Sequence, residues 1–107
     1  MVKHVFIPQG GFHIGFEHAK QIDWDHARNI IGCSLIEVAQ ARWDGENYVM
    51  LVDEEGLFSQ KKENLKASKA YHDYWFWYNK EHPEDARDEL DIIRRKIAGH
   101  VILAGKL

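Results

Sequence analysis

Two apolar runs on either side of an Asp-Gly pair dominate the hydrophobic pattern of this chain. Residues 33–56 read C-S-L-I-E-V-A-Q-A-R-W-D-G-E-N-Y-V-M-L-V-D-E-E-G. An Asp-Gly pair between apolar runs is a strong hairpin signal, because the favoured two-residue turn needs positive φ at both central positions. Residues 48–52 are all apolar, which is typical of a strand covered on both faces. The sequence therefore predicts a central hairpin over residues 33–53.

Two segments have the period and the end signals of a helix. Residues 23–32 form a short amphipathic stretch, with Asp23 as its capping residue and Gly32 at its end. Residues 65–79 carry apolar side chains three and four positions apart. The expected buried stripe of this second helix is Ala67, Ala70, Tyr71, Tyr74, Trp75 and Tyr78.

A third helix is expected to open at Pro83 and to end at Gly99. Acidic residues gather near its start and basic residues near its end, which suits the helix dipole. Its expected buried stripe is Ala86, Leu90, Ile93 and Ile97.

Short apolar segments complete the predicted sheet. Residues 3–7 precede Pro8, and residues 12–16 follow a glycine-rich turn. Residues 100–104 form a last strand, which we expect to return beside the central hairpin. The pattern predicts one α+β domain over residues 1–107: an antiparallel sheet built on the hairpin, covered by one short N-terminal helix and two longer C-terminal helices.

Composition narrows the class of protein. Among 107 residues there are 14 basic and 17 acidic side chains, intermixed, and the net charge is −3, which argues against a surface for duplex nucleic acid. No apolar run approaches the roughly 20 residues that span a bilayer, and the N-terminus has no secretory pattern. The single cysteine, Cys33, cannot close an intrachain disulfide and is expected to be a small buried hydrophobe. We therefore expect a cytoplasmic protein with no membrane partner.

The glycine-rich segment at residues 9–16, Q-G-G-F-H-I-G-F, has two interpretations. It is either a turn before a short strand or a backbone cradle for a phosphate, centred on Gly10, Gly11 and His13. The spacing of a phosphate-binding loop, G-x-x-x-x-G-K followed by Ser or Thr, is absent.

Three consecutive carboxylates follow the hairpin, at Asp53, Glu54 and Glu55. Neighbouring strand residues point to opposite faces, so we interpret them as a solvated turn closed by Gly56 and not as a metal or acid–base site. The seven histidines match no common ligand spacing, and no nucleophile motif occurs. We therefore predict no catalytic residue, no metal and no cofactor.

Two aromatic residues, Phe76 and Trp77, fall outside the apolar stripe of residues 65–79. They are part of a self-association surface, of a wider core, or of a stacking surface for a ligand. The first interpretation leads us to expect a homo-oligomer.

Several short blocks together resemble a family of short domains of unknown function found in phages, plasmids and other mobile elements. The blocks are I-I-G-C-S-L-I-E-V at 30–38, L-V-D-E-E-G at 51–56, N-L-K-A at 64–67 and I-A-G-H-V-I-L at 97–103. The resemblance implies a mobile-element origin, and Glu37, Asp53, Glu54 and Asn64 as matched polar positions; it implies no established activity. This chain departs from the family pattern by a longer helical insert, at about 68–96, and by its own glycine-rich N-terminal segment.

The chain is also similar, in size and composition, to phage sponge proteins, which sequester nucleotide immune signals of the host. By that analogy we predict a non-enzymatic protein that binds a nucleotide-derived small molecule in the host cytoplasm. The expected ligand-binding residues are Gly10, Gly11, His13, Glu37, Arg42 and Asn64, and Phe76 and Trp77 are expected at an interface. One alternative is a protein–protein inhibitor of a host defence or restriction enzyme; the other is a small hydrolase acting on a nucleotide.

Overall fold

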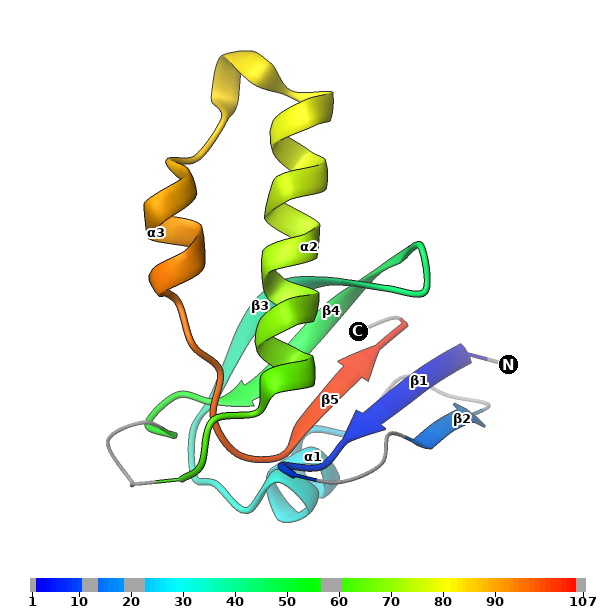
Figure 1. Ribbon diagram of the computed structural model, residues 1–107. Coiled ribbons are helices and arrows are strands. Elements are labelled where there is room, and N and C mark those ends of the chain that lie inside the picture. The colour runs from blue at the N-terminus through cyan, green and yellow to red at the C-terminus, as the bar shows by residue number, and fades with distance from the viewer. Residues whose placement is uncertain (1, 11–13, 19–22, 57–60, 106–107) are drawn as a thin grey trace.

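The computed structural model of the protein describes residues 2–10, 14–18, 23–56 and 61–105 (Figure 1). Its strands are β1 (Val2–Ile7), β2 (Ile14–His18), β3 (Ile36–Trp43), β4 (Glu46–Asp53) and β5 (Val101–Ala104). Its helices are α1 (Trp24–Ile31), α2 (Leu65–Glu81) and α3 (Glu89–Arg94). All strand pairs are antiparallel, in the order β2-β1-β5-β4-β3, so the predicted α+β class is confirmed.

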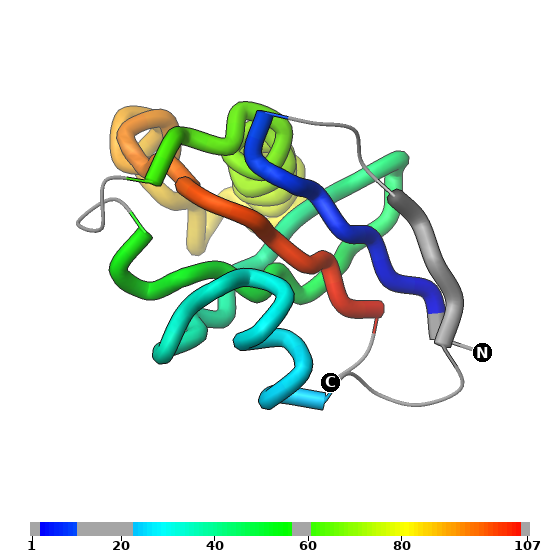
Figure 2. The backbone as a smooth tube through the Cα atoms, turned by 90° about the horizontal axis from the view of Figure 1, so that it is seen from below, coloured from blue at the N-terminus to red at the C-terminus, as the bar shows by residue number. Residues whose placement is uncertain are grey.

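The β3–β4 hairpin forms where the sequence predicted it. Both turn residues have positive φ, 50° at Asp44 and 74° at Gly45, as the two-residue turn requires. Apolar clusters cover both faces of β4: Met50 belongs to the cluster under α2, and Leu51 to the cluster under α1. Figure 2 shows α1 and α2 on opposite sides of the sheet. The run of apolar residues in β4 is thus explained by a strand whose two faces are both buried.

The middle of the sheet belongs to β5, which lies between β1 and β4. All four of its residues are buried. The expected pairing of the last strand with the hairpin is confirmed, and the hairpin fills one side of the sheet with β3 outermost. Helix α1 also begins and ends as predicted: Asp23 caps it by accepting the N–H of Asp25, and Gly32 ends it with a left-handed φ of 75°.

The two halves of α2 have different surroundings (Figure 1). Its first half lies on the sheet, where Ala67, Ala70 and Tyr71 are buried in the core. Its second half continues beyond the sheet, and the aromatic residues at positions 74–78 are all half-buried there. The apolar stripe of the sequence is therefore real: its first half is buried in the sheet core, and in its second half Trp75 packs against that core while remaining half-buried.

The predicted helix from Pro83 to Gly99 is wrong. A 3₁₀ turn at Pro83–Asp85 comes first, and α3 spans only Glu89–Arg94, which makes it shorter than α1. Asp88 explains the break, because its carboxylate accepts the N–H groups of Leu90 and Asp91, at 2.8 and 3.4 Å, and so starts a new helix.

The expected buried stripe of this segment is also wrong. Leu90 and Ile93 are 59% and 51% exposed, and Ala86 is exposed as well, whereas Ile92 is buried. Ile97 is buried, but it lies beyond the end of α3. None of the helices in the described ranges is long and apolar enough to cross a membrane.

Candidate ligand-binding site

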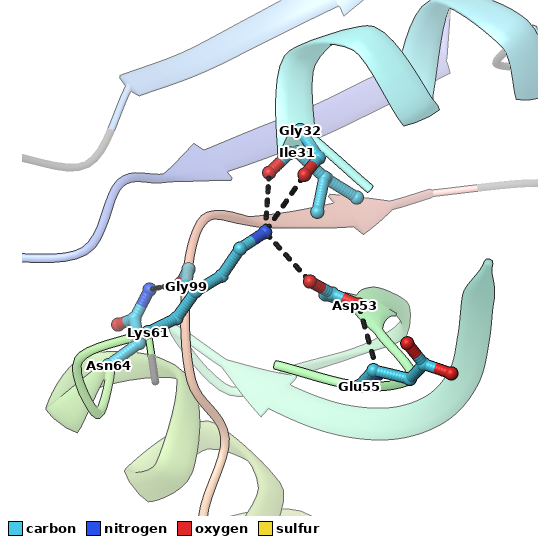
Figure 3. A network of polar contacts seen from close by, with 7 residues as sticks. All are labelled: Ile31, Gly32, Asp53, Glu55, Lys61, Asn64 and Gly99. Carbon is cyan, nitrogen blue, oxygen red and sulfur yellow. Dashed lines mark hydrogen bonds and ion pairs between the residues drawn. The ribbon is translucent and has the colours of Figure 1, made fainter. Parts of the chain in front are cut away.

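Two of the four matched polar residues, Asp53 and Asn64, lie among the polar contacts at the base of α2 (Figure 3). The Lys61 ammonium lies 2.7 Å from the Asp53 carboxylate and 3.0 Å from the carbonyl oxygen of Gly32. It thereby joins the end of β4 to the C-terminus of α1, where helix carbonyls lack partners. The expected solvated turn is wrong for Asp53, whose side chain is only 7% exposed, although Glu54 and Glu55 are exposed.

Asn64 is a structural residue and not the predicted ligand-binding residue. Its side chain is buried, and its amide nitrogen donates to the carbonyl oxygens of Ile7 and Gly99, both at 2.9 Å. Its amide oxygen accepts the N–H of Ala67 at 3.1 Å and so caps α2. Both amide hydrogens have acceptors, so the side chain presents no donor to a ligand.

Two glycines of the matched blocks are required by the same network. A Cβ on Gly56 would lie 3.0 Å from the carbonyl oxygen of Ala98. Gly99 has a φ of +82°, and a Cβ there would lie 2.9 Å from the Lys61 side chain. Among the matched polar positions, Asp53 and Asn64 therefore stabilise the fold, whereas Glu37 and Glu54 lie outside this network.

A cleft of about 360 Å³ opens between β3, α2 and the segment around α3; we name it the β3–α3 cleft. Its main polar and aromatic lining residues are Glu37, Tyr71, Trp75, Arg87 and Arg95. Arg95 donates to the carboxylate of Glu37, and this ion pair also borders a second hollow of about 260 Å³ near Asp53 and Glu54. Glu37 is the predicted ligand-binding residue that lies in this cleft.

Arg87 differs from Arg95 because its guanidinium rests on a ring. The guanidinium carbon lies 3.5 Å from the ring centroid of Trp75, and Arg87 forms no ion pair with any described residue. The Asn79 side chain fixes the Arg87 backbone by two hydrogen bonds of 2.9 Å, one to its carbonyl oxygen and one from its N–H. The indole N–H of Trp75 is buried and finds no acceptor within the described ranges. Within the described ranges, the cleft thus contains the Arg87 guanidinium, which has no carboxylate partner, and the Trp75 indole N–H, which has no acceptor.

On the opposite flank of α2, the structure brings together Arg42, Phe76 and Trp77, three of the predicted residues. The Arg42 guanidinium lies 4.7 Å from the Trp77 ring centroid and donates to the Asn47 side chain at 2.7 Å. All three border a hollow of about 330 Å³ at the β3–β4 turn. Arg42 and Glu37 are therefore separated into two different recesses.

Of the glycine-rich candidates, Gly10 is described, and it lines neither recess. Gly10 follows β1, which β5 and β4 separate from β3 in the sheet. Gly11 and His13 lie outside the described residues. A phosphate cradle at Gly10 is therefore not part of the β3–α3 cleft.

The other chemical candidates are the Cys33 thiol and the side chains that could bind a metal ion. Burial, and after it the nearby Asp53 carboxylate, raises the pKa of the Cys33 thiol above its ordinary value of 9.0. The thiol therefore stays protonated near neutral pH. Cys33 packs beside the α1 cluster as a small hydrophobe, but it is half-buried and not buried as expected. In the described part of the chain, no three His, Cys, Asp or Glu side chains are grouped to hold a metal ion.

The sequence did not reveal the β3–α3 cleft. The apolar period places Trp75 in the core stripe. Arg95 is one of the basic residues that the pattern places near the end of the predicted third helix, but α3 ends before it. The only local signal for Arg87 was the capping residue Asp88 directly after it, which marks the break in the predicted helix.

The chain was also compared with known proteins. No family model, no curated protein sequence and no solved structure matches it. The resemblance to mobile-element domains stays a prediction.

Proposed function

We propose that the protein is a non-enzymatic binding protein that sequesters a nucleotide-derived small molecule in the β3–α3 cleft. The observation that supports this most is the Arg87 guanidinium, stacked 3.5 Å from the Trp75 ring centroid without a carboxylate partner in the described ranges. A guanidinium binds phosphate oxygens in bidentate fashion, and an indole stacks on a base. A cleft of about 360 Å³ is within the range of small-molecule sites.

In this proposal Arg87 occupies the place of the ligand. Its guanidinium covers the indole face on which a base stacks, at the modest energy of an exposed cation–π contact, about 0.5–1 kcal/mol. An entering base displaces the guanidinium, which then pairs with the phosphate. Asn79 holds the Arg87 backbone, so only the side chain has to move.

The Glu37–Arg95 ion pair gives the cleft a direction. The Glu37 carboxylate repels a phosphate and already uses one guanidinium, so the phosphate belongs at the Arg87 end. A carboxylate accepts hydrogen bonds from base amino groups and from ribose hydroxyls. Glu37 therefore suits the nucleoside end of the ligand.

The biological setting that we propose, countering a host defence that signals through such a molecule, comes from the resemblance alone. The lining of the cleft supports the ligand chemistry that we propose: a phosphate, a planar ring and a hydroxyl or amino group.

Calorimetry with a panel of ADP-ribose-type and cyclic-nucleotide signals tests the proposal. We expect one class to bind, and we expect Arg87→Gln to weaken its affinity at least about tenfold, since a charged hydrogen-bond pair is lost. Arg94→Gln removes an exposed charge on α3 that does not line the cleft, and it should leave affinity within about twofold. Absence of heat with the whole panel, or equal losses in both variants, would contradict the proposal.

A second candidate is inhibition of a host defence or restriction enzyme by protein contact. Leu90 and Ile93 on α3 are 59% and 51% exposed, and Phe76 and Trp77 are half-buried on the helix beside it. Large exposed apolar side chains can mark partner or subunit surfaces. A Phe76→Ser, Trp77→Ser double variant should lose capture of the enzyme. If it instead dissociates a homo-oligomer and retains capture, these residues serve self-association.

A further inference from the structure

A groove follows the flank of α2 opposite the β3–α3 cleft; we name it the α2 flank groove. It consists of two adjoining hollows of about 280 and 330 Å³, which share Arg42, Asp44 and Asp73 in their linings. The β3–β4 turn forms one wall and α2 the other. The cleft proposed for a nucleotide-derived molecule lies elsewhere, so the two recesses are independent.

The groove is long because its α2 residues repeat at helical spacing. Lys66, Lys69, Asp73, Phe76 and Lys80 are separated by three or four positions and therefore lie along one flank. From the first to the last of these, the helix rises about 21 Å. Such a length exceeds what one mononucleotide covers and suits an extended chain.

The charge of the groove is opposite to that of the whole protein. Arg42, Lys66, Lys69 and Lys80 line it, against the two carboxylates of Asp44 and Asp73. The chain as a whole has a net charge of −3. A concave surface lined by excess cations concentrates anions, even on an acidic protein.

Aromatic rings lie among these cations. Phe76 is half-buried, and it makes no ring contact with another described aromatic side chain, unlike Tyr74, Trp75, Trp77 and Tyr78. Its ring therefore has no aromatic partner among the described residues, and it borders the groove. Trp77 lies beside it, under the guanidinium of Arg42. Proteins bind single strands through two elements, cations for the phosphates and aromatic rings for the bases.

We propose that the α2 flank groove binds single-stranded nucleic acid, on the order of four nucleotides at a time. Phosphates contact Lys80, Arg42 and the lysines of the first turns of α2, and a base stacks on Phe76. A duplex keeps its bases inside and has nothing to stack on the ring. An acidic peptide uses the cations but leaves the rings without a partner.

Fluorescence anisotropy with labelled single strands of about ten nucleotides, oligo-dT in one arm and oligo-rU in the other, tests this proposal. We expect binding in at least one arm, weakening as salt rises from about 50 to 200 mM. Lys80→Gln should weaken binding several-fold and reduce the slope of log K against log salt by about 0.7, the value for one phosphate contact to a single strand. Phe76→Ala should weaken it at least about fivefold through lost stacking.

Lys62→Gln is the matched control, because Lys62 is exposed and lies outside the groove. It should leave binding within about twofold. Lack of binding up to about 0.1 mM protein, equal binding of a duplex, equal competition by polyglutamate, or equal effects of Lys62→Gln and Lys80→Gln would each overturn the proposal. Arg87→Gln should leave strand binding unchanged, so this site and the nucleotide cleft fail or succeed separately.

Discussion

The two halves of α2 differ in what lies beneath them. In the first half, small and aromatic residues such as Ala67, Ala70 and Tyr71 are buried on the sheet, and Asn64 caps the helix from inside the core. In the second half, the rings contact one another, as in the pair of Tyr74 and Trp75 with centroids 5.0 Å apart. One continuous helix therefore builds the fold at its base and offers surface farther along.

The cationic side chains near the two halves of α2 also differ in how firmly they are held. At the base, Lys61 is held by a carboxylate and by two helix carbonyls, so moving it exposes a buried acid. Farther along, Arg87 and Arg42 rest on the rings of Trp75 and Trp77. A guanidinium on a half-exposed ring is released at small cost, whereas an ammonium in a partly buried network is not. We infer that the aromatic contacts for binding belong to the second half of α2, and that the contacts which stabilise the fold belong to the first.

Removing the Asn64 side chain should have the largest effect. Asn64→Ala leaves two buried carbonyl oxygens without donors and removes a helix cap, so we expect a loss of about 3 kcal/mol in the free energy of unfolding. Urea denaturation measures it. Asn29→Ala, on the exposed face of α1, is the control and should change stability by less than about 0.5 kcal/mol. Similar losses in both variants would remove the structural role given to the network.

Lys61→Met should come next. It leaves the nearly buried Asp53 carboxylate without its cation and the end of α1 without a donor, at a cost of about 2 kcal/mol after allowance for partial exposure of the lysine. The contrast is Lys69→Met, which breaks an exposed pair with Asp73 and should cost no more than about 0.5 kcal/mol. Equal midpoints in urea for the two variants would break the comparison between base and surface cations.

Phe76→Ser should cost less than about 1 kcal/mol, because the ring is half-exposed and has no aromatic partner in the described ranges. Tyr71→Ser, one helix face away on the sheet, should cost about 3 kcal/mol. Thermal unfolding of both variants gives the ratio. If Phe76→Ser costs as much as Tyr71→Ser, the second half of α2 is core, and its role in binding falls.

The smallest expected effect is on the pH dependence of stability. Burial raises the pKa of Cys33 above 9.0 in the folded protein, so the unfolded chain loses this proton first as pH rises. The corresponding stability is complete below pH 9.0 and is lost as pH rises towards the folded pKa. Cys33→Ala should therefore lose less stability on raising the pH past 9.0 than the wild type does, as urea midpoints will show. Tyr48, whose pKa burial also raises, stays in both proteins and cancels.

Local signals explain which parts of the fold were predictable. Asp23 and Gly32 predict the ends of α1, and Asp44-Gly45 predicts the hairpin turn, because each of these signals depends only on neighbouring backbone groups. The central place of β5 was not predictable in this way, since its partners β1 and β4 lie far along the chain. In the region of α3, a continuous apolar period outweighed the cap at Asp88, and the predicted helix was too long.

The candidate site residues were predictable only where they lie on one helix or strand. Phe76 and Trp77 were noticed because they leave the stripe of a single helix. Arg87 and Trp75 meet through the break after α2, and Glu37 meets Arg95 from the sheet edge. No residue spacing in the sequence predicts these contacts, because they depend on the turn after α2, which the Asn79 side chain fixes.

The position of β5 has a consequence for how the chain is made. Residues 101–104 lie between the β1–β2 pair and the β3–β4 pair. During synthesis, the inner edges of these two pairs, β1 and β4, therefore stay unpaired until these residues leave the ribosome. Sheet closure is then one late step that joins distant segments, and such topologies fold slowly. Before β5 emerges, the nascent chain therefore exposes two unpaired strand edges to chaperones, and β5 covers both of these edges in the folded structure.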